Sequence, residues 1–181
     1  MTEIDVLRTW ARRHGGDIVR VAPKDFAHVK QLPSFSDAPF SSNDIGVHWR
    51  SARVVYAGAT LWTEFVHELG HCFASRVGID DQFEFDFLGW EVALVRELGL
   101  DYDAWRHENR YYAVTKQGKE FGDLNRNQQD QLVEERIRHG QAIGIVDQEG
   151  RVLSVRHDVR PVPATLRRFL DKRKRLRTVT T

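Results

Sequence analysis

The sequence predicts an α+β domain with a small mixed or antiparallel sheet. Several segments place apolar residues at helical spacing, while a few short segments alternate apolar and polar residues as strands do. The chain has 181 residues, of which 41% are hydrophobic, so it is long enough to bury one core of ordinary size. We therefore expect a single domain over residues 1–165, followed by a basic tail over residues 166–181.

The N-terminal segments predict a helix, a strand and a long loop. Residues 4–14 have the spacing of an amphipathic helix, which ends at Gly15. Residues 18–22 alternate as a strand does. Residues 23–44 are rich in Pro, Ser and Asp, which favours a loop with one helical turn near residues 26–29. A loop of this length either borders a functional cleft or is an ordinary surface loop.

A hairpin is expected next, over residues 46–49 and 53–57, and it leads directly into a helix. This helix is expected over residues 60–75, with Thr60 as its N-cap and Gly78 as its end signal. Five apolar residues follow helical spacing on the side that faces the core: Leu61, Phe65, Leu69, Cys72 and Phe73.

The same helix contains an HExxH motif, His67-Glu68-Leu69-Gly70-His71. Two histidines four residues apart lie one turn above the other on a helix face, so their imidazoles can bind a single cation. Glu68 lies beside them, where a carboxylate can take a proton from a metal-bound water, as metal-assisted hydrolysis requires. The motif predicts a hydrolytic metal site with His67 and His71 as ligands and Glu68 as the general base.

A catalytic zinc site usually has three protein ligands and one open position, so a third donor is needed. The metzincin pattern requires a third histidine at position 77, where this chain has Val77. Cys72, the only cysteine, follows His71 on the helix and points about 100° away from the motif face. It is expected to be a buried apolar residue. The third ligand is therefore expected to be a carboxylate.

Residues 80–91 contain five acidic residues and no basic residue. Glu91 is the best candidate for the third ligand, because it begins a second helix with apolar periodicity over residues 90–98. Asp86 is a competing candidate and Glu84 is a weaker one.

These residues resemble the active site of the gluzincin metallopeptidases, which include the thermolysin-like enzymes and the ImmA/IrrE group. The resemblance covers roughly residues 45–100 and rests on His67, Glu68, His71 and Glu91. It implies a zincin-like fold, in which one helix carries HExxH and a following helix carries the third ligand. It also implies one Zn²⁺ per chain, hydrolysis of peptide bonds in a peptide or protein substrate, and an edge strand that can pair with an extended peptide.

One departure from that family concerns the orientation of the ligands. Thermolysin-like enzymes have an aspartate one turn after the third ligand, which orients a zinc histidine, and this chain has Val95 there. A ligating imidazole normally donates its other N–H to a carboxylate or carbonyl. Glu64, one turn before His67, is a candidate for this role.

Residues 101–112 are aromatic and polar, and they contain His107 and Tyr111 four residues apart. A peptidase needs a donor for the developing oxyanion besides its metal, and a neighbouring His or Tyr can supply it. His107 and Tyr111 are therefore further catalytic candidates. Half-buried packing is the alternative role for both.

The C-terminal third predicts a polar helix and a second hairpin. Residues 125–139 have an apolar stripe at helical spacing and end at Gly140. Residues 142–146 and 151–156 alternate as strands around a turn at residues 147–150.

Charge is distributed unevenly along the chain. The net charge is +1, yet the basic tail holds seven basic residues and one acidic residue. Such a run is either a solvated terminal helix or a patch that contacts nucleic acid or an acidic protein. The alternative function is therefore a non-catalytic binding module with a zincin-like scaffold, in which the basic tail makes the main contact.

Three features favour a cytoplasmic protein without a membrane anchor. No run approaches the length of about 18 apolar residues that a membrane span needs. The N-terminus lacks the apolar stretch of a signal peptide, and a single cysteine fits a reducing compartment.

Overall fold

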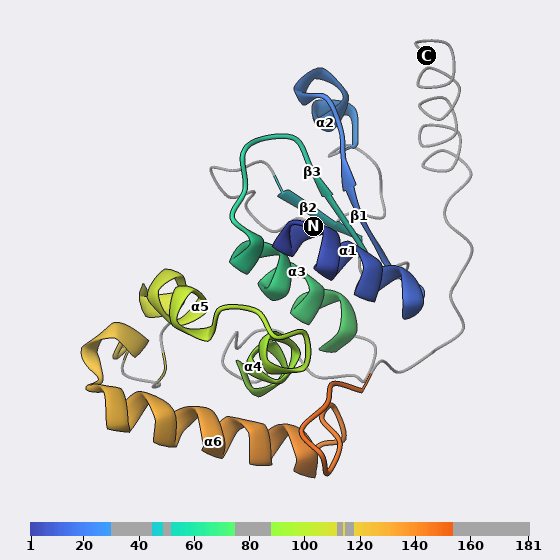
Figure 1. Ribbon diagram of the computed structural model, residues 1–181. Helices are drawn as coiled ribbons and strands as arrows, with labels where there is room; N and C mark the ends of the chain where they lie inside the picture. Colours follow the sequence, from blue (N-terminus) through green and yellow to red (C-terminus); the bar gives the residue numbers. More distant parts are fainter. Residues whose placement is uncertain (30–44, 49–51, 75–87, 112–113, 115–117, 154–181) are drawn as a thin grey trace.

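The computed structural model describes residues 1–29, 45–48, 52–74, 88–111, 114 and 118–153 (Figure 1). These residues form six α-helices, two short 3₁₀ helices and one three-stranded sheet. The predicted α+β class is confirmed. The zincin-like assignment stays a prediction.

The N-terminal segment forms helix α1 (Glu3–Arg13), strand β1 (Asp17–Arg20) and helix α2 (Pro23–Val29). A capping box holds the start of α1, because the Thr2 side chain accepts from the Asp5 backbone N–H and Asp5 accepts from the Thr2 backbone. The bounds of the predicted helix and strand are confirmed to within two residues. The predicted helical turn is a complete short helix, and the rest of the predicted loop, residues 30–44, lies outside the described part of the chain.

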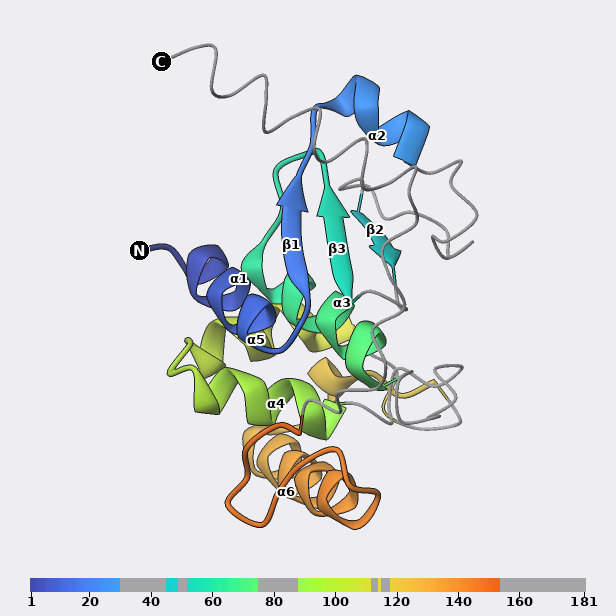
Figure 2. The ribbon, with the colours of Figure 1, turned by 90° about the vertical axis from the view of Figure 1, so that its right-hand side faces the viewer.

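Strands β2 (Ile45–His48) and β3 (Arg53–Tyr56) form the predicted hairpin. Strand β3 is central in the order β1-β3-β2, antiparallel to β2 and parallel to β1. Val54 lies opposite Ile18 on one side and Val47 on the other. The sheet is therefore mixed, and β2 forms one of its edges among the described strands (Figure 2).

Helix α3 (Trp62–Ala74) follows β3 and packs against the sheet, with α1 beside it (Figures 1 and 2). The helix begins two residues after Thr60, so the predicted N-cap is placed too early. Leu61 precedes the helix and is 51% exposed, which corrects its assignment to the core. The other four predicted core residues of this helix are buried: Phe65, Leu69, Cys72 and Phe73.

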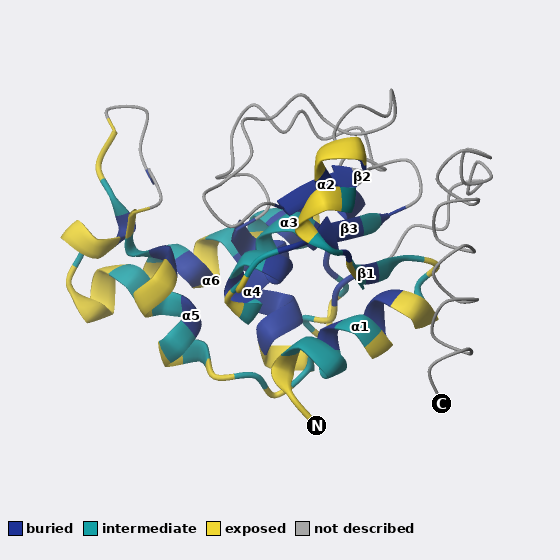
Figure 3. Cartoon of the chain, turned by 90° about the horizontal axis from the view of Figure 1, so that it is seen from above, coloured by how far each residue is buried: buried dark blue, intermediate teal, exposed yellow. Residues whose placement is uncertain are grey.

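Helix α4 (Leu88–Glu97) lies in a second layer beneath α3. Every residue from position 88 to 95 is buried, so this helix is enclosed on all sides rather than on one stripe (Figure 3). Helix α6 (Arg126–Ala142) covers its outer side. Helix α5 (Tyr102–Glu108) contacts both α3 and α4.

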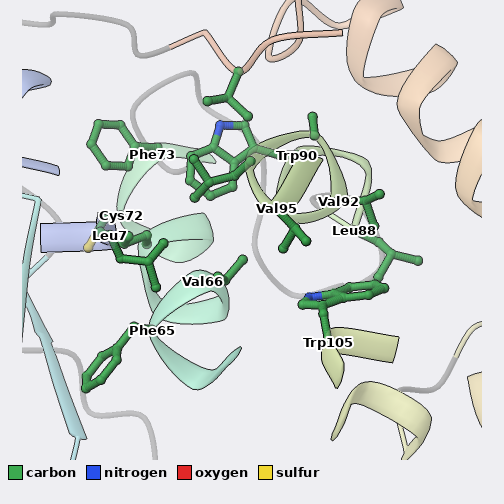
Figure 4. Close-up of a cluster of buried hydrophobic side chains, with 14 of the residues drawn as sticks. Leu7, Phe65, Val66, Cys72, Phe73, Leu88, Trp90, Val92, Val95 and Trp105 are labelled. Carbon is green, nitrogen blue, oxygen red and sulfur yellow. The ribbon is translucent and has the colours of Figure 1, made fainter. Parts of the chain in front are cut away.

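Aromatic rings link these layers into one core (Figure 4). The rings of Phe73, from α3, and Trp90, from α4, stack with their centroids 5.8 Å apart. Trp10, from α1, meets both of these rings edge-on. The contact between α3 and α4 is therefore a packed apolar interface that fixes the two helices relative to each other.

The C-terminal part differs from its prediction. Helix α6 continues through Gly140 to Ala142, and Asn125 caps its start together with Gln128. Within the described residues 142–153, the predicted second hairpin forms one bridge, between Val146 and Val152. Short 3₁₀ helices cover Asn109–Tyr111 and Phe121–Asp123.

Two further predictions concern the rest of the molecule. The basic tail and the end of the predicted hairpin lie outside the described residues. Among the helices that are described, none has the length and apolar character to cross a bilayer.

Gly89 provides a test of the contact between α4 and α6. A Cβ at this position would collide with the Arg136 carbonyl oxygen and lie 2.9 Å from the backbone nitrogen of Ile137. The Gly89→Ala variant should lower the free energy of unfolding by about 1–3 kcal/mol, the usual cost of overpacking. Gln131→Ala, at an exposed position of α6, is the matched control. Denaturant unfolding that shows Gly89→Ala as stable as the control would contradict this packing.

Candidate metal centre

Helix α3 positions the three residues of the HExxH motif. Phe65, Val66 and Leu69 are buried in the core, while His67, Glu68 and His71 are each partly exposed on another side of the helix. Because the apolar side is held by the sheet, α1 and α4, the motif is presented from a rigid element.

The two histidine rings converge as their spacing predicts. The Nε2 atoms of His67 and His71 are 3.0 Å apart, and the ring centroids are 4.6 Å apart at an interplanar angle of 86°. Both Nε2 atoms are thus directed at the same small volume. Imidazole nitrogens that converge on one point are donors of the kind that zinc binds.

Glu91 contacts this pair from α4 through the other nitrogen of His67. Its Oε1 lies 3.0 Å from His67 Nδ1, and its Oε2 accepts a hydrogen bond of 3.1 Å from Trp105 Nε1. The Glu91 side chain is fully buried. Since a carboxylate only accepts, His67 carries a hydrogen on Nδ1, and in the neutral ring its Nε2 presents the lone pair.

The electrostatic environment keeps His71 neutral. Burial, and then the charge of His67, lower the pKa of His71 from 6.5 to about 3. A histidine must be deprotonated to bind a metal ion. At neutral pH, His71 is already in that state.

The third ligand is not settled by these contacts. The carboxylate of Glu91 lies on the Nδ1 side of His67, and Asp86 and Glu84 lie outside the described residues. Within the part of the chain that is described, no group of three or more His, Cys, Asp or Glu residues is placed to hold a metal ion. Glu91 as the third ligand stays a prediction.

His107 and Tyr111 lie at the surface. His107 is 70% exposed and its Nδ1 is 3.2 Å from both Glu108 and Arg110. Tyr111 is 65% exposed and accepts from Arg110, whose guanidinium covers its ring. Residues two apart on a helix point about 200° apart, so His107 faces away from the side on which Trp105 reaches Glu91. Their role at an oxyanion stays a prediction.

Trp105 is the site residue to which the sequence analysis gave no function. It is fully buried, with its ring stacked on Tyr102 and in an edge-to-face contact with Phe121. One signal was present in the sequence: a tryptophan on a short helix that becomes buried needs an acceptor for its N–H. A nearby buried carboxylate is such an acceptor, but the pairing depends on how α4 and α5 pack.

The lowered pKa of His71 leads to a prediction for the metal-free protein. A histidine whose pKa is depressed by folding adds stability above about pH 6.5, and this contribution is lost as the pH falls toward 3. Between pH 7 and 5, the stability of chelator-treated wild type should fall more steeply than that of His71→Gln, by at most about 1.4 kcal/mol per pH unit. The exposed His107→Gln is the control. Denaturant titrations at several pH values give the free energy of unfolding as a function of pH. The same pH dependence in wild type and His71→Gln would contradict the lowered pKa of His71.

No family model matches the chain, and neither a curated protein nor a solved structure matches it.

Proposed function

We propose that this protein is a zinc-dependent metallopeptidase. The observation that carries the proposal is the pair of Nε2 atoms, 3.0 Å apart, on one helix that also bears Glu68. Imidazoles that converge from one side of a packed helix fit a cation with tetrahedral nitrogen and oxygen ligands, as zinc prefers. His67 and His71 would hold the ion, and a carboxylate from Glu91, Asp86 or Glu84 would be the third ligand.

Bound zinc would lower the pKa of a water molecule and polarise a substrate carbonyl. Glu68 follows His67 directly in the chain and is partly exposed, so its carboxylate can accept the proton that the attacking water loses. The same group can then deliver that proton to the leaving amine. Glu68 is therefore the general base and then the general acid of this proposal.

The edge of the sheet offers a place for an extended substrate. Strand β2 pairs with β3 on one side and has no strand on its other side among the described residues. A peptide that adds to such an edge binds through its backbone, whatever its side chains are. Helix α3 contacts both β2 and β3, so this edge and the HExxH helix belong to one packed unit.

The Glu68→Gln variant tests the chemistry separately from metal binding. It keeps the shape of the side chain but removes the proton acceptor, so hydrolysis of labelled casein should fall by at least about 100-fold, the usual scale of acid–base catalysis. Zinc content, measured after purification without chelator, should stay near one ion per chain.

Glu135→Gln, at an exposed carboxylate of α6, is the control and should match wild type in both measurements. His71→Ala should lose the zinc. Wild-type cleavage by Glu68→Gln would remove Glu68 from the mechanism, and wild-type protein without zinc would remove the metal centre.

The rival function is a non-catalytic module that binds nucleic acid or an acidic protein through the basic tail. Seven basic residues against one acidic residue over positions 166–181 are the observation behind it. If this function holds, removal of residues 166–181 should weaken binding to duplex DNA, and the affinity of the full chain should fall steeply between 50 and 200 mM salt, roughly as phosphate neutralisation requires. Fluorescence anisotropy with labelled DNA measures the affinity of the full and the shortened chain and its dependence on salt. Equal affinity with and without the tail would contradict this function.

A further inference from the structure

We propose that Glu91 is a positioning residue that fixes the tautomer of His67, and that Trp105 holds its carboxylate in place for this purpose. The inference rests on the proposed metal centre and specifies how its first ligand is prepared. It assigns to Glu91 a role different from that of third ligand.

Both oxygens of Glu91 already have directed partners. Oε1 faces His67 Nδ1 at 3.0 Å, and Oε2 accepts from Trp105 Nε1 at 3.1 Å. The three side chains come from three helices, α3, α4 and α5, which contact one another. Because each oxygen has its own donor, the carboxylate of Glu91 is held in one orientation. In that orientation it presents an acceptor to Nδ1 of His67.

Trp105 makes this arrangement hard to change. Its side chain is fully buried between Tyr102 and Phe121, so its N–H has no access to water. An indole N–H donates and cannot accept. If Glu91 turned toward the Nε2 side of His67, it would leave this buried donor without an acceptor.

The position of the carboxylate determines which nitrogen of His67 is available. Nδ1 and Nε2 point in different directions from the imidazole ring, and the Nε2 of His67 is the one directed at His71. With Nδ1 of the neutral ring donating to Glu91, the lone pair lies on Nε2, where the predicted cation would bind. This is the role that an outer carboxylate has in metal sites: it selects the tautomer, fixes the ring and raises the basicity of the ligand.

The Glu91→Gln variant tests the proposal because an amide has one acceptor and one donor end. Trp105 can only donate, so it should take the amide oxygen, which turns the NH₂ group toward His67 Nδ1. His67 must then accept through Nδ1 and carry its hydrogen on Nε2, which blocks metal binding. We expect the zinc affinity, measured by competition with a chromogenic chelator, to fall about 10- to 100-fold.

A second substitution distinguishes a positioning role from a direct ligand. Trp105→Phe removes the N–H, so in the double variant Glu91→Gln, Trp105→Phe the amide can rotate and offer its oxygen to His67 Nδ1–H. Zinc affinity should therefore recover in the double variant relative to Glu91→Gln. If Glu91 were the third ligand, removal of Trp105 would give no recovery, and that result would overturn the proposal. Trp105→Phe alone is the control for the loss of the indole.

Nitrogen NMR of the metal-free protein tests the same point without any metal. Long-range ¹H–¹⁵N correlations should show the Nδ1–H tautomer of His67 in wild type and in the double variant, and the Nε2–H tautomer in Glu91→Gln. An unchanged tautomer in Glu91→Gln would also overturn the proposal. This measurement needs no zinc. A wild-type protein that binds no zinc would therefore refute the metallopeptidase, while the tautomer of His67 would still decide the role of Glu91.

Discussion

The buried carboxylate of Glu91 is the interaction on which the arrangement of the site depends. Burying a carboxylate away from water is costly unless hydrogen-bond donors replace the water, and here the donors are His67 and Trp105. Because these residues belong to α3 and α5, satisfying Glu91 sets the position of both helices relative to α4. The apolar contacts of Phe73 and Trp90 supply the attraction between α3 and α4, and the polar contacts define their register.

The elements that the sequence predicted correctly are those whose pattern is local. Helices α1, α3 and α6 have apolar residues at helical spacing, and only four residues separate β2 from β3 in the sequence. The convergence of His67 and His71 is local in the same sense, because a spacing of four residues on any α-helix brings two side chains to one face. Neither conclusion needs knowledge of how the helices pack.

The features that escaped prediction depend on packing between distant segments. The sequence places Glu91 in the first turn of a helix after the motif, but no spacing rule tells which nitrogen of His67 its carboxylate reaches. Trp105 lies 14 residues from Glu91, and their hydrogen bond exists only because α5 contacts α4. Helix α4 is buried on all sides, so its sequence lacks the polar stripe that would reveal its orientation.

The hydrogen bonds also determine where the protons of the histidine pair lie before any cation binds. Glu91 places a hydrogen of His67 on Nδ1, so the Nε2 of a neutral His67 is an acceptor. The Nε2 of His71, 3.0 Å away, must then be the donor in the metal-free protein. Because burial keeps the pKa of His71 at about 3, this donor is a neutral imidazole at pH 7. A cation between the two Nε2 atoms would require His71 to move its proton to Nδ1, and the net charge of the pair would stay the same. Glu91 and Trp105 therefore hold His67 in the tautomer that can bind a cation. His71 must change its tautomer before it can bind the same cation.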